Sequence, residues 1–305
     1  MRQIITLLFF LLLIPDSIAE VKVDKNVFYA ENGGQKLCLD IYRDDKAKSE
    51  GRCLIFVFGG GFINGSKDEP QNRDFCSKMA ERGMTVAAID YRLGMKGAGK
   101  VGVLDTKPID FAIQMAVEDL FSATKFLVDN KSEYGIDDNK IFICGSSAGA
   151  ITVLQADYER ANKKELAQKY LPEDFCYAGV ISFAGAIFSH EGTPDYKSAP
   201  APTFFFHGTE DKLVAYNKIR FFNKGLFGTK SLVKRFEKMG FTYRVFRYVG
   251  YGHEIASSPM ERNVADVTTF IMNPGAIKSV DCTINDTTIP HSKIGGASPD
   301  SYYKK

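Results

Sequence analysis

One serine of the sequence stands at the centre of a Gly-x-Ser-x-Gly motif, a spacing that is typical of enzymes with a nucleophilic serine. Residues 145–149 read Gly-Ser-Ser-Ala-Gly, which makes Ser147 the central residue. The motif directly follows the apolar run 140–144 and opens a helical pattern. A sharp turn between a strand and a helix projects the hydroxyl, and the flanking positions need glycine because the two elements approach closely there. This setting predicts that Ser147 is a nucleophile.

A serine hydroxyl is a weak nucleophile, so it needs a base, and the base needs a carboxylate that fixes its orientation. In the chain order that belongs to this motif, the acid follows a late strand and the histidine comes last. Asp211 lies in the loop after the apolar run 203–207, and His253 follows the strand-like run 241–249. We therefore predict a catalytic triad of Ser147, Asp211 and His253.

Other residues near these positions are alternatives to the predicted base and acid. His207 ends a strand beside the proposed acid, where we expect a structural role, with that of the base as the alternative. Glu210 stands next to Asp211 and is the alternative carboxylate, because the end of a strand is predictable only to within a residue or two. The two remaining histidines, His190 and His291, lie in loop-like segments, and we expect them to be exposed.

Acyl transfer from an ester passes through a negatively charged oxygen, and N–H groups fixed toward that oxygen usually make the largest catalytic contribution. Three glycines at 59–61 follow the apolar run 53–58, where their backbone can approach a substrate closely. We predict that the N–H groups of Gly60, Gly61 and Ala148 form this oxyanion hole. The alternative is that the glycines only make a flexible turn after a strand.

The elements that must position these residues alternate between strand and helix patterns. Two short strands, 21–30 and 36–42, flank Asn-Gly-Gly at 32–34, which is typical of a hairpin. Such alternation implies an α/β fold whose mostly parallel central sheet is entered by an antiparallel hairpin and covered by helices on both faces. Apolar runs predict further strands at 53–58, 84–90, 140–144, 177–183, 203–207 and 241–249. Helical spacing predicts helices at 70–82, 111–130, 147–158, 217–239 and 259–271.

The two ends of the chain differ from the segment between them. Residues 1–19 combine an early arginine, an apolar run and small residues before Glu20, which predicts a secretory signal peptide, with an N-terminal membrane anchor as the alternative. Residues 20–272 form the predicted catalytic domain, and 273–305 is a polar tail that is either loosely ordered or packed back through Cys282. We therefore expect a secreted or periplasmic protein with no membrane contact after removal of the signal.

The composition limits the classes of protein to which the chain can belong. An apolar fraction of 45% among 305 residues allows a buried core, and 39 Lys and Arg against 37 Asp and Glu argue against binding of nucleic acid. Six cysteines permit up to three disulfides in an exported protein, but Cys53 and Cys144 lie in apolar runs that are typical of buried thiols. The cysteines and histidines do not have the spacing of a zinc site, so we expect no metal.

The motifs, taken in order, resemble those of the α/β-hydrolase carboxylesterases, and in particular the secreted bacterial acetyl- and feruloyl-esterase-like enzymes. This resemblance extends over about residues 35–272 and implies the triad and the oxyanion hole given above, with no cofactor. The family usually has a histidine before the three glycines, where this chain has Phe58. That histidine braces the glycine loop, so the departure concerns the rigidity of the loop more than the chemistry. The matching motifs are Gly59-Gly60-Gly61-Phe62 with Gly65-Ser66, Asp90-Tyr91-Arg92-Leu93, the serine motif, His207-Gly208-Thr209-Glu210-Asp211 and Gly252-His253.

The resemblance implies hydrolysis of a carboxylic ester through an acyl-enzyme, with a small-molecule or glycan-borne ester as the substrate. Only about 17 residues separate the strand that ends near 185 from the one that begins at 203, which is too short for a large lid. We therefore expect a short lid or none, an open pocket partly lined by residues 94–108, and short acyl or aryl groups such as acetyl or feruloyl. Two alternatives are a serine peptidase of the same fold, which usually carries a large accessory domain that is absent here, and a non-catalytic binding module, which normally has lost a triad residue. The oligomeric state does not follow from the sequence.

Overall fold

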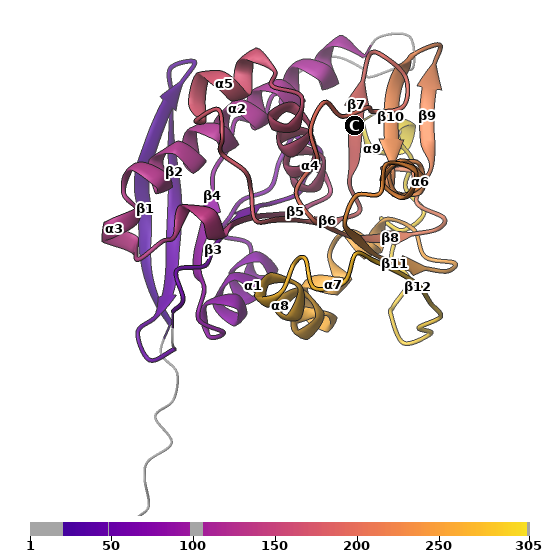
Figure 1. Ribbon diagram of the computed structural model, residues 1–305. Helices are drawn as coiled ribbons and strands as arrows, with labels where there is room; N and C mark the ends of the chain where they lie inside the picture. The colour runs from indigo at the N-terminus through magenta and orange to yellow at the C-terminus, as the bar shows by residue number, and fades with distance from the viewer. Residues whose placement is uncertain (1–20, 48, 98–105, 304–305) are drawn as a thin grey trace, which may run out of the picture.

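The computed structural model describes residues 21–47, 49–97 and 106–303, so the predicted signal peptide lies outside the described residues. A nine-stranded sheet forms the centre of the molecule, with the strand order β1-β2-β4-β3-β5-β6-β8-β11-β12 (Figure 1). Its strands are β1 (Val21–Asn32), β2 (Gln35–Asp44), β3 (Cys53–Val57), β4 (Thr85–Ile89), β5 (Ile141–Ser146), β6 (Gly179–Phe183), β8 (Thr203–Gly208), β11 (Tyr243–Tyr248) and β12 (Ser279–Ile284).

The sheet begins with antiparallel pairs and continues with parallel ones. The strand β2 pairs antiparallel with both β1 and β4, and the other strand pairs of this sheet are parallel. The central strands β3, β5, β6 and β8 are buried along their whole length, which explains why they read as continuous apolar runs. The prediction of a mostly parallel sheet entered by an antiparallel hairpin is therefore confirmed.

Helices cover both faces of this sheet (Figure 1). The helix α2 begins earlier than predicted, because Pro108 fits the first turn of a helix. Its residues Ala116, Leu120, Ala123 and Leu127 are buried, as their spacing predicts. On one face lie α2 (Lys107–Asp129), α4 (Ala148–Ala161), α5 (Glu165–Tyr170) and α6 (Thr229–Met239), and on the other α1 (Pro70–Ala80), α7 (Ser258–Arg262) and α8 (Val264–Met272). The short helices α3 (Lys131–Tyr134) and α9 (Pro299–Tyr302) and the 3-10 turns Asp138–Lys140 and His253–Ala256 complete the described helices.

The predicted helix over 217–239 is wrong in its first half. The chain instead forms a hairpin of β9 (Lys218–Phe221) and β10 (Lys224–Gly228), and only α6 is helical. The strand β10 also pairs with β7 (Ala186–Ser189), which gives a second, three-stranded sheet in the order β7-β10-β9. Isoleucine and phenylalanine favour strands, and the partner β7 lies far back in the chain, so local helical spacing could not reveal the pairing.

The polar segment 273–305 packs back onto the domain instead of lying loose. Its strand β12 pairs parallel with β11, from Tyr243 opposite Ser279 to Tyr248 opposite Ile284. The contact is a main-chain ladder, and Cys282 is a free, partly exposed thiol on this strand. Alternate residues of β12 are exposed, as in an edge strand. This exposure explains the polar composition of the segment, because of which no strand was predicted there. The folded domain therefore extends beyond residue 272.

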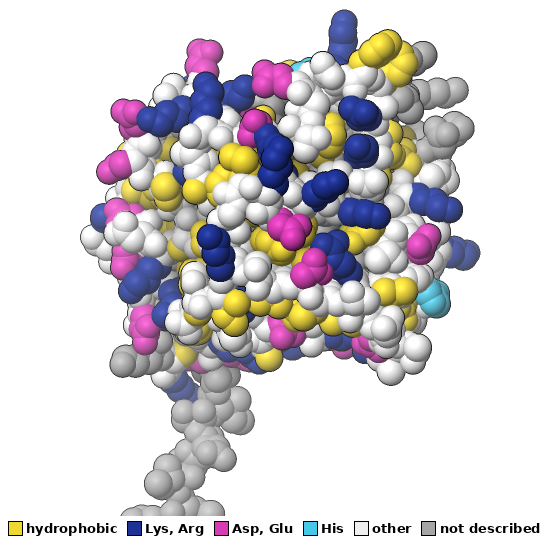
Figure 2. All heavy atoms as spheres, turned by 45° about the vertical axis from the view of Figure 1, so that its right-hand side comes forward, with side chains coloured by type: hydrophobic (Ala, Val, Ile, Leu, Met, Phe, Trp, Pro, Cys, Tyr) yellow, Lys and Arg dark blue, Asp and Glu magenta, His cyan; other side chains and the backbone are white. Residues whose placement is uncertain are grey.

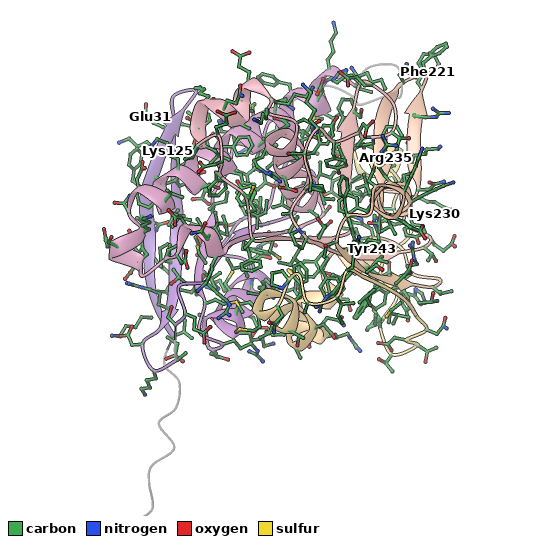
Figure 3. All side chains as sticks on the ribbon, in the orientation of Figure 1. Glu31, Lys125, Phe221, Lys230, Arg235 and Tyr243 are labelled. Atoms are coloured by element: carbon green, nitrogen blue, oxygen red, sulfur yellow. The ribbon has the colours of Figure 1, made fainter. Side chains whose placement is uncertain are left out.

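One side of the molecule is rich in basic side chains. Lys and Arg gather on the side that carries α6 and the β9–β10 hairpin (Figure 2). Lys230 and Arg235 lie on α6, and Phe221 lies at the outer end of the hairpin (Figure 3). The basic residues and this exposed aromatic ring thus belong to one continuous part of the chain.

Candidate active site

Ser147 lies in the turn between β5 and α4, with a backbone conformation that residues other than glycine seldom adopt. Its φ is 52° and its ψ is −114°, and its N–H donates to the carbonyl of Phe183 on β6 at 2.9 Å. A Cβ at Gly145 would overlap the backbone of Gly149, and a Cβ at Gly149 would overlap the carbonyl of Val57. The turn has the strand-turn-helix geometry expected from the motif, and the two glycines permit it because no side chain fits beside them.

The three predicted triad residues lie in one chain of hydrogen bonds. Oγ of Ser147 is 2.7 Å from Nε2 of His253, and Nδ1 of His253 is 2.8 Å from Oδ2 of Asp211. The side chains of His253 and Asp211 are both buried. An ionised carboxylate can only accept, so Nδ1 carries the proton, which leaves Nε2 as the acceptor for the serine hydroxyl. The arrangement can therefore take the proton from Ser147.

The carboxylate of Asp211 is held from several sides. The N–H groups of Leu213 and Val214 donate to its Oδ1 at 2.9 and 3.0 Å, and ring nitrogens of His253 and His207 lie 2.8 and 3.3 Å from its Oδ2. Burial by itself raises the pKa of Asp211, but the hydrogen bonds from His207 and His253 outweigh it and hold that pKa well below its usual range. The group is therefore ionised at neutral pH and can stabilise a protonated His253.

His207, the alternative base, is fully buried and engaged through both ring nitrogens. Its Nε2 is 2.9 Å from the carbonyl of Val214, and its Nδ1 is 2.8 Å from Oγ1 of Thr229. Because a carbonyl only accepts, Nε2 carries the proton and the hydroxyl of Thr229 donates to Nδ1. This agrees with the structural role expected for His207, although no local pattern predicts that the ring also contacts the carboxylate of Asp211.

The other alternative residues lie apart from the triad. Glu210 is exposed, whereas Asp211 is buried. His190 is exposed and pairs with Asp110 at 2.9 Å. His291 is exposed and pairs with Glu254 at 3.1 Å. The structure therefore brings together the first choice for each member of the triad.

The loop that carries His253 rests on the C-terminal segment. A Cβ at Gly252 would overlap the carbonyl of Gly295, and the N–H of His253 points to the same carbonyl at 3.4 Å. Oε2 of Glu254 accepts from the N–H of Gly252 at 3.1 Å and packs against Gly295. This contribution was not predicted from the sequence, where the only signal was a pair of glycines within a polar tail.

Two of the three predicted oxyanion donors line the same cavity as the nucleophile. Ala148 is the first residue of α4, so its N–H has no acceptor in the hydrogen-bond ladder of that helix. Gly61 borders the cavity from the glycine loop, together with Ser147 and Ala148. Gly60 lies one residue behind this lining, with a φ of 121° that favours glycine. The chain thus presents backbone N–H groups beside Ser147 from both the helix and the loop.

Aromatic packing and backbone hydrogen bonds brace the glycine loop at the position where Phe58 replaces histidine. The ring of Phe58 lies 4.5 Å from that of Tyr91, measured between centroids, and the hydroxyl of Tyr91 donates to the carbonyl of Phe58 at 3.0 Å. Burial raises the pKa of Tyr91, so its hydroxyl stays protonated and remains a donor. Further along, the N–H of Met95 donates to the carbonyl of Phe62 at 2.9 Å. The loop is therefore fixed without the usual histidine.

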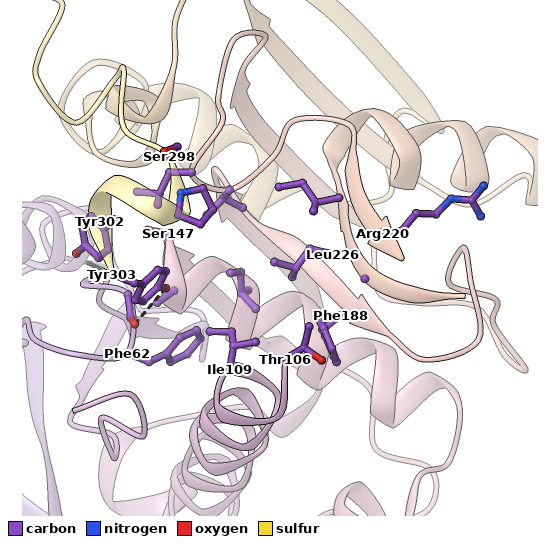
Figure 4. A pocket seen from close by; sticks show the side chains of 18 of the residues that line it. Phe62, Thr106, Ile109, Ser147, Phe188, Arg220, Leu226, Ser298, Tyr302 and Tyr303 are labelled. Carbon is purple, nitrogen blue, oxygen red and sulfur yellow. Dashed lines mark hydrogen bonds between the residues drawn. The ribbon is translucent and has the colours of Figure 1, made fainter. Parts of the chain in front are cut away.

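A cavity of about 290 Å³ opens in front of Ser147 (Figure 4). Its lining is mainly apolar and aromatic. The β9–β10 hairpin covers one side of it, and Phe188 from β7 contributes to the same wall. Within the predicted 94–108 loop, Thr106 lines the cavity, while residues 98–105 lie outside the described residues. Other lining residues are Phe62, Ile109, Ile151, Leu213, Val214, Ile219, Arg220, Phe221, Lys224, Gly225, Leu226, Ser298, Pro299, Tyr302 and Tyr303.

The helix α9 closes the cavity from the side of the glycine loop. The hydroxyl of Tyr303 donates to the carbonyl of Gly61 at 3.3 Å, and the ring of Tyr302 packs on the α-carbon of the same glycine (Figure 4). Ser298 begins the helix and forms reciprocal capping hydrogen bonds with Ser301. Neither tyrosine was predicted to belong to the site, although a Ser-Pro helix start followed by a tyrosine pair stands out within a polar tail.

The chain is similar to known proteins in both sequence and structure. The model of the BD-FAE family matches residues 39–187, a stretch that includes the glycine loop and Ser147 and ends before Asp211. Gut esterase 1 of Caenorhabditis elegans is 32% identical over 128 residues, which are 42% of this chain and 22% of that protein. The probable isoprenylcysteine alpha-carbonyl methylesterase of Oryza sativa subsp. japonica is 31% identical over 148 residues, which are 48% of this chain and 31% of that protein. The match thus spans less than a third of the length of either relative.

The solved structures add a likeness that covers most of the chain. Thermogutta terrifontis esterase 2 phosphoramylated by tabun superposes with a TM-score of 0.61 at 23% identity. The superposition covers 84% of this chain and 95% of that one. At this level of identity the likeness concerns the fold, and it confirms the predicted α/β-hydrolase fold.

Proposed function

We propose that this chain is a carboxylesterase with the α/β-hydrolase fold and that it hydrolyses carboxylic esters through an acyl-enzyme on Ser147. The observation that carries the proposal is the hydrogen-bonded chain from Ser147 through His253 to Asp211, with 2.7 and 2.8 Å between the bonded atoms. It lies at the wall of a cavity that can admit a substrate of moderate size.

In the proposed reaction, Oγ of Ser147 attacks the ester carbonyl while Nε2 of His253 takes the hydroxyl proton. The N–H groups of Gly60, Gly61 and Ala148 stabilise the oxyanion, and His253 then gives its proton to the departing alcohol. Water attacks the acyl-enzyme by the same route and releases the acid and the free serine. Asp211 stabilises the positive charge on His253 in both halves. Protein groups and water balance every step, so the reaction needs no metal or cofactor.

An apolar, aromatic cavity favours esters of short acyl or aryl acids, such as acetyl or feruloyl groups carried by carbohydrate or by a small molecule. Both relatives described above are named as esterases, and only the second name specifies an ester. Export by the predicted signal peptide 1–19 would make the protein secreted or periplasmic, where such substrates occur. This narrower substrate class is part of the proposal.

The test is hydrolysis of p-nitrophenyl esters of increasing acyl length and of methyl ferulate, with the Ser147→Ala variant beside the wild type. We expect Ser147→Ala to lower kcat by about 10⁴-fold or more, because the nucleophile is lost. Ser146→Ala is the matched control, since this neighbouring hydroxyl donates to the carbonyl of Ala256 instead of facing the base. Equal rates for Ser147→Ala and the wild type would contradict the proposal. Cleavage of peptides with no cleavage of esters would favour the peptidase alternative.

A further inference from the structure

The charged residues are unevenly distributed along the chain, although its net charge is small. Residues 212–239 contain eight Lys or Arg and one Glu, so the remainder of the chain has five more acidic than basic residues. This segment includes β9, β10 and α6, which lie on the side of the molecule where basic side chains gather (Figure 2). The positive charge is therefore concentrated on one surface.

This charge is not neutralised by neighbouring carboxylates. Among the residues that the structure describes, Arg235 alone of the eight cations has an ion pair, with Asp195 at 2.5 Å. Lys218, Lys230 and Lys234 are exposed. Unpaired cations on one surface create a positive potential that attracts a polyanion or an anionic surface.

Two phenylalanines stand at the tip of the hairpin within this basic surface. Phe221 is 50% exposed and Phe222 is 81% exposed, and Phe221 lies at the outer end of the hairpin (Figure 3). Phe222 has a φ of 51°, in the left-handed region that bulky residues disfavour. Neither core packing nor turn geometry accounts for an aromatic residue there. Exposed apolar rings of this kind mark a site of interaction.

We propose that the β9–β10 hairpin and α6 form a peripheral docking surface for an anionic lipid bilayer. The two rings enter the interfacial region of the bilayer, and the surrounding lysines and Arg220 face the lipid phosphates. The rings are inclined by 80° to each other with centroids 4.6 Å apart. On a convex tip they cannot both lie flat on a planar ligand such as a sugar ring, whereas the disordered edge of a bilayer accepts both.

The proposed docking is at the surface of the bilayer. No helix in the described part of the chain has the length and apolarity to cross a bilayer. The sequence-based expectation of no membrane contact rested on the lack of a second spanning segment, which does not bear on surface binding. The same hairpin lines the cavity through Ile219, Phe221 and Leu226. Docking would therefore turn the cavity toward the lipid, so that an apolar ester could enter from the bilayer; this last step rests on the proposed function.

The test is cosedimentation of the full chain with vesicles of phosphatidylglycerol and phosphatidylcholine, compared with vesicles of phosphatidylcholine alone. We expect binding to the anionic vesicles that weakens with added salt. Phe222→Ser should weaken partitioning about tenfold, because one ring no longer enters the interface. Lys230→Glu and Lys234→Glu should each weaken it about fivefold or more.

Matched controls lie on the opposite edge of the molecule. Phe28→Ser removes a phenylalanine that is 52% exposed on β1, and Lys36→Glu reverses an exposed charge on β2. Both should bind vesicles as the wild type does. Phe222 and Lys230 do not line the cavity, so their variants should hydrolyse a soluble ester at the wild-type rate.

Three outcomes would overturn the docking proposal. They are no binding to anionic vesicles, equal loss of binding in the Phe222→Ser and Phe28→Ser variants, and binding to polygalacturonate or self-association in place of vesicle binding. Failure of the proposed function is distinguishable, because vesicle binding needs no catalysis. A wild type that binds vesicles and hydrolyses no ester would refute the esterase and leave the docking surface standing.

Discussion

The catalytic wall of the cavity and its cover are built in different ways. Ser147, Asp211 and His253 follow β5, β8 and β11, three parallel strands of the central sheet. The cover consists of the β9–β10 hairpin, whose first strand is exposed at every residue, and of the four-residue helix α9. The chemistry is thus fixed to the buried sheet, while substrate contacts come from surface segments that can vary without unfolding it.

This difference predicts that the two walls tolerate substitution unequally. In the catalytic wall, neighbouring backbone segments pack so closely at Gly145 and Gly149 that one added carbon atom has no space. Atoms in the cover are positioned by single hydrogen bonds and by exposed rings. The substitutions below span that range.

The largest effect is expected for Asp211→Asn. The amide can present its N–H₂ to Nδ1 of His253 and stabilise the wrong tautomer, so kcat should fall by about 10⁴-fold. The measurement is kcat for a p-nitrophenyl ester across the pH range. Glu210→Gln is the matched control, because this adjacent carboxylate is exposed, and it should stay within about twofold of the wild type. A loss as large in Glu210→Gln as in Asp211→Asn would mean that the acid was misassigned.

A smaller but clear effect is expected for Gly145→Ala at the turn before the nucleophile. The added Cβ overlaps the backbone of Gly149, so the free energy of unfolding should fall by about 3 kcal/mol. Denaturant unfolding of the variant and the wild type measures the change. Gly275→Ala is the control, since no atom lies within 4 Å of a Cβ added there. Equal stability of the two variants would show that the catalytic wall is less tightly packed than described.

The smallest effect is expected for Tyr303→Phe in the cover. The variant keeps the ring and loses the hydrogen bond to the carbonyl of Gly61, so the glycine loop is held less firmly. We expect kcat to fall about threefold to tenfold with little change in KM, consistent with the modest value of one hydrogen bond. Tyr170→Phe removes a comparable hydroxyl on α5, which donates to Glu118, and should leave kcat unchanged. If both variants behave alike, Tyr303 does not act on the loop.

The catalytic wall and the cover of the cavity also differ in how well they could be predicted from the sequence. The Ser147 motif and the strand before it are contiguous, and the order of Asp211 and His253 follows the order of the strands, so local patterns were sufficient. The cover depends on pairing between β7 and β10 and on the return of the C-terminal segment. Such contacts join parts of the chain that no local periodicity connects, and the predicted helix over 217–239 was wrong for this reason.

Two features of the site itself were also beyond local patterns. The contact of His207 with Asp211 depends on the path of the chain after β8, because the loop turns back on the ring. The bracing of the glycine loop by Phe58 and Tyr91 joins the ends of neighbouring strands β3 and β4. The sequence indicated a missing histidine, and only the packing shows what replaces it.

Because Gly295 supports the His253 loop, the active site is complete only after the segment that contains Gly295 has been synthesised. The serine turn, the carboxylate and the base are all synthesised before residues 279–303, yet the base loop rests on Gly295 and the glycine loop on Tyr303. A nascent chain in which residues 279–303 are still inside the ribosome lacks both supports. The complete site therefore arises only after these residues have emerged and β12 has joined the sheet.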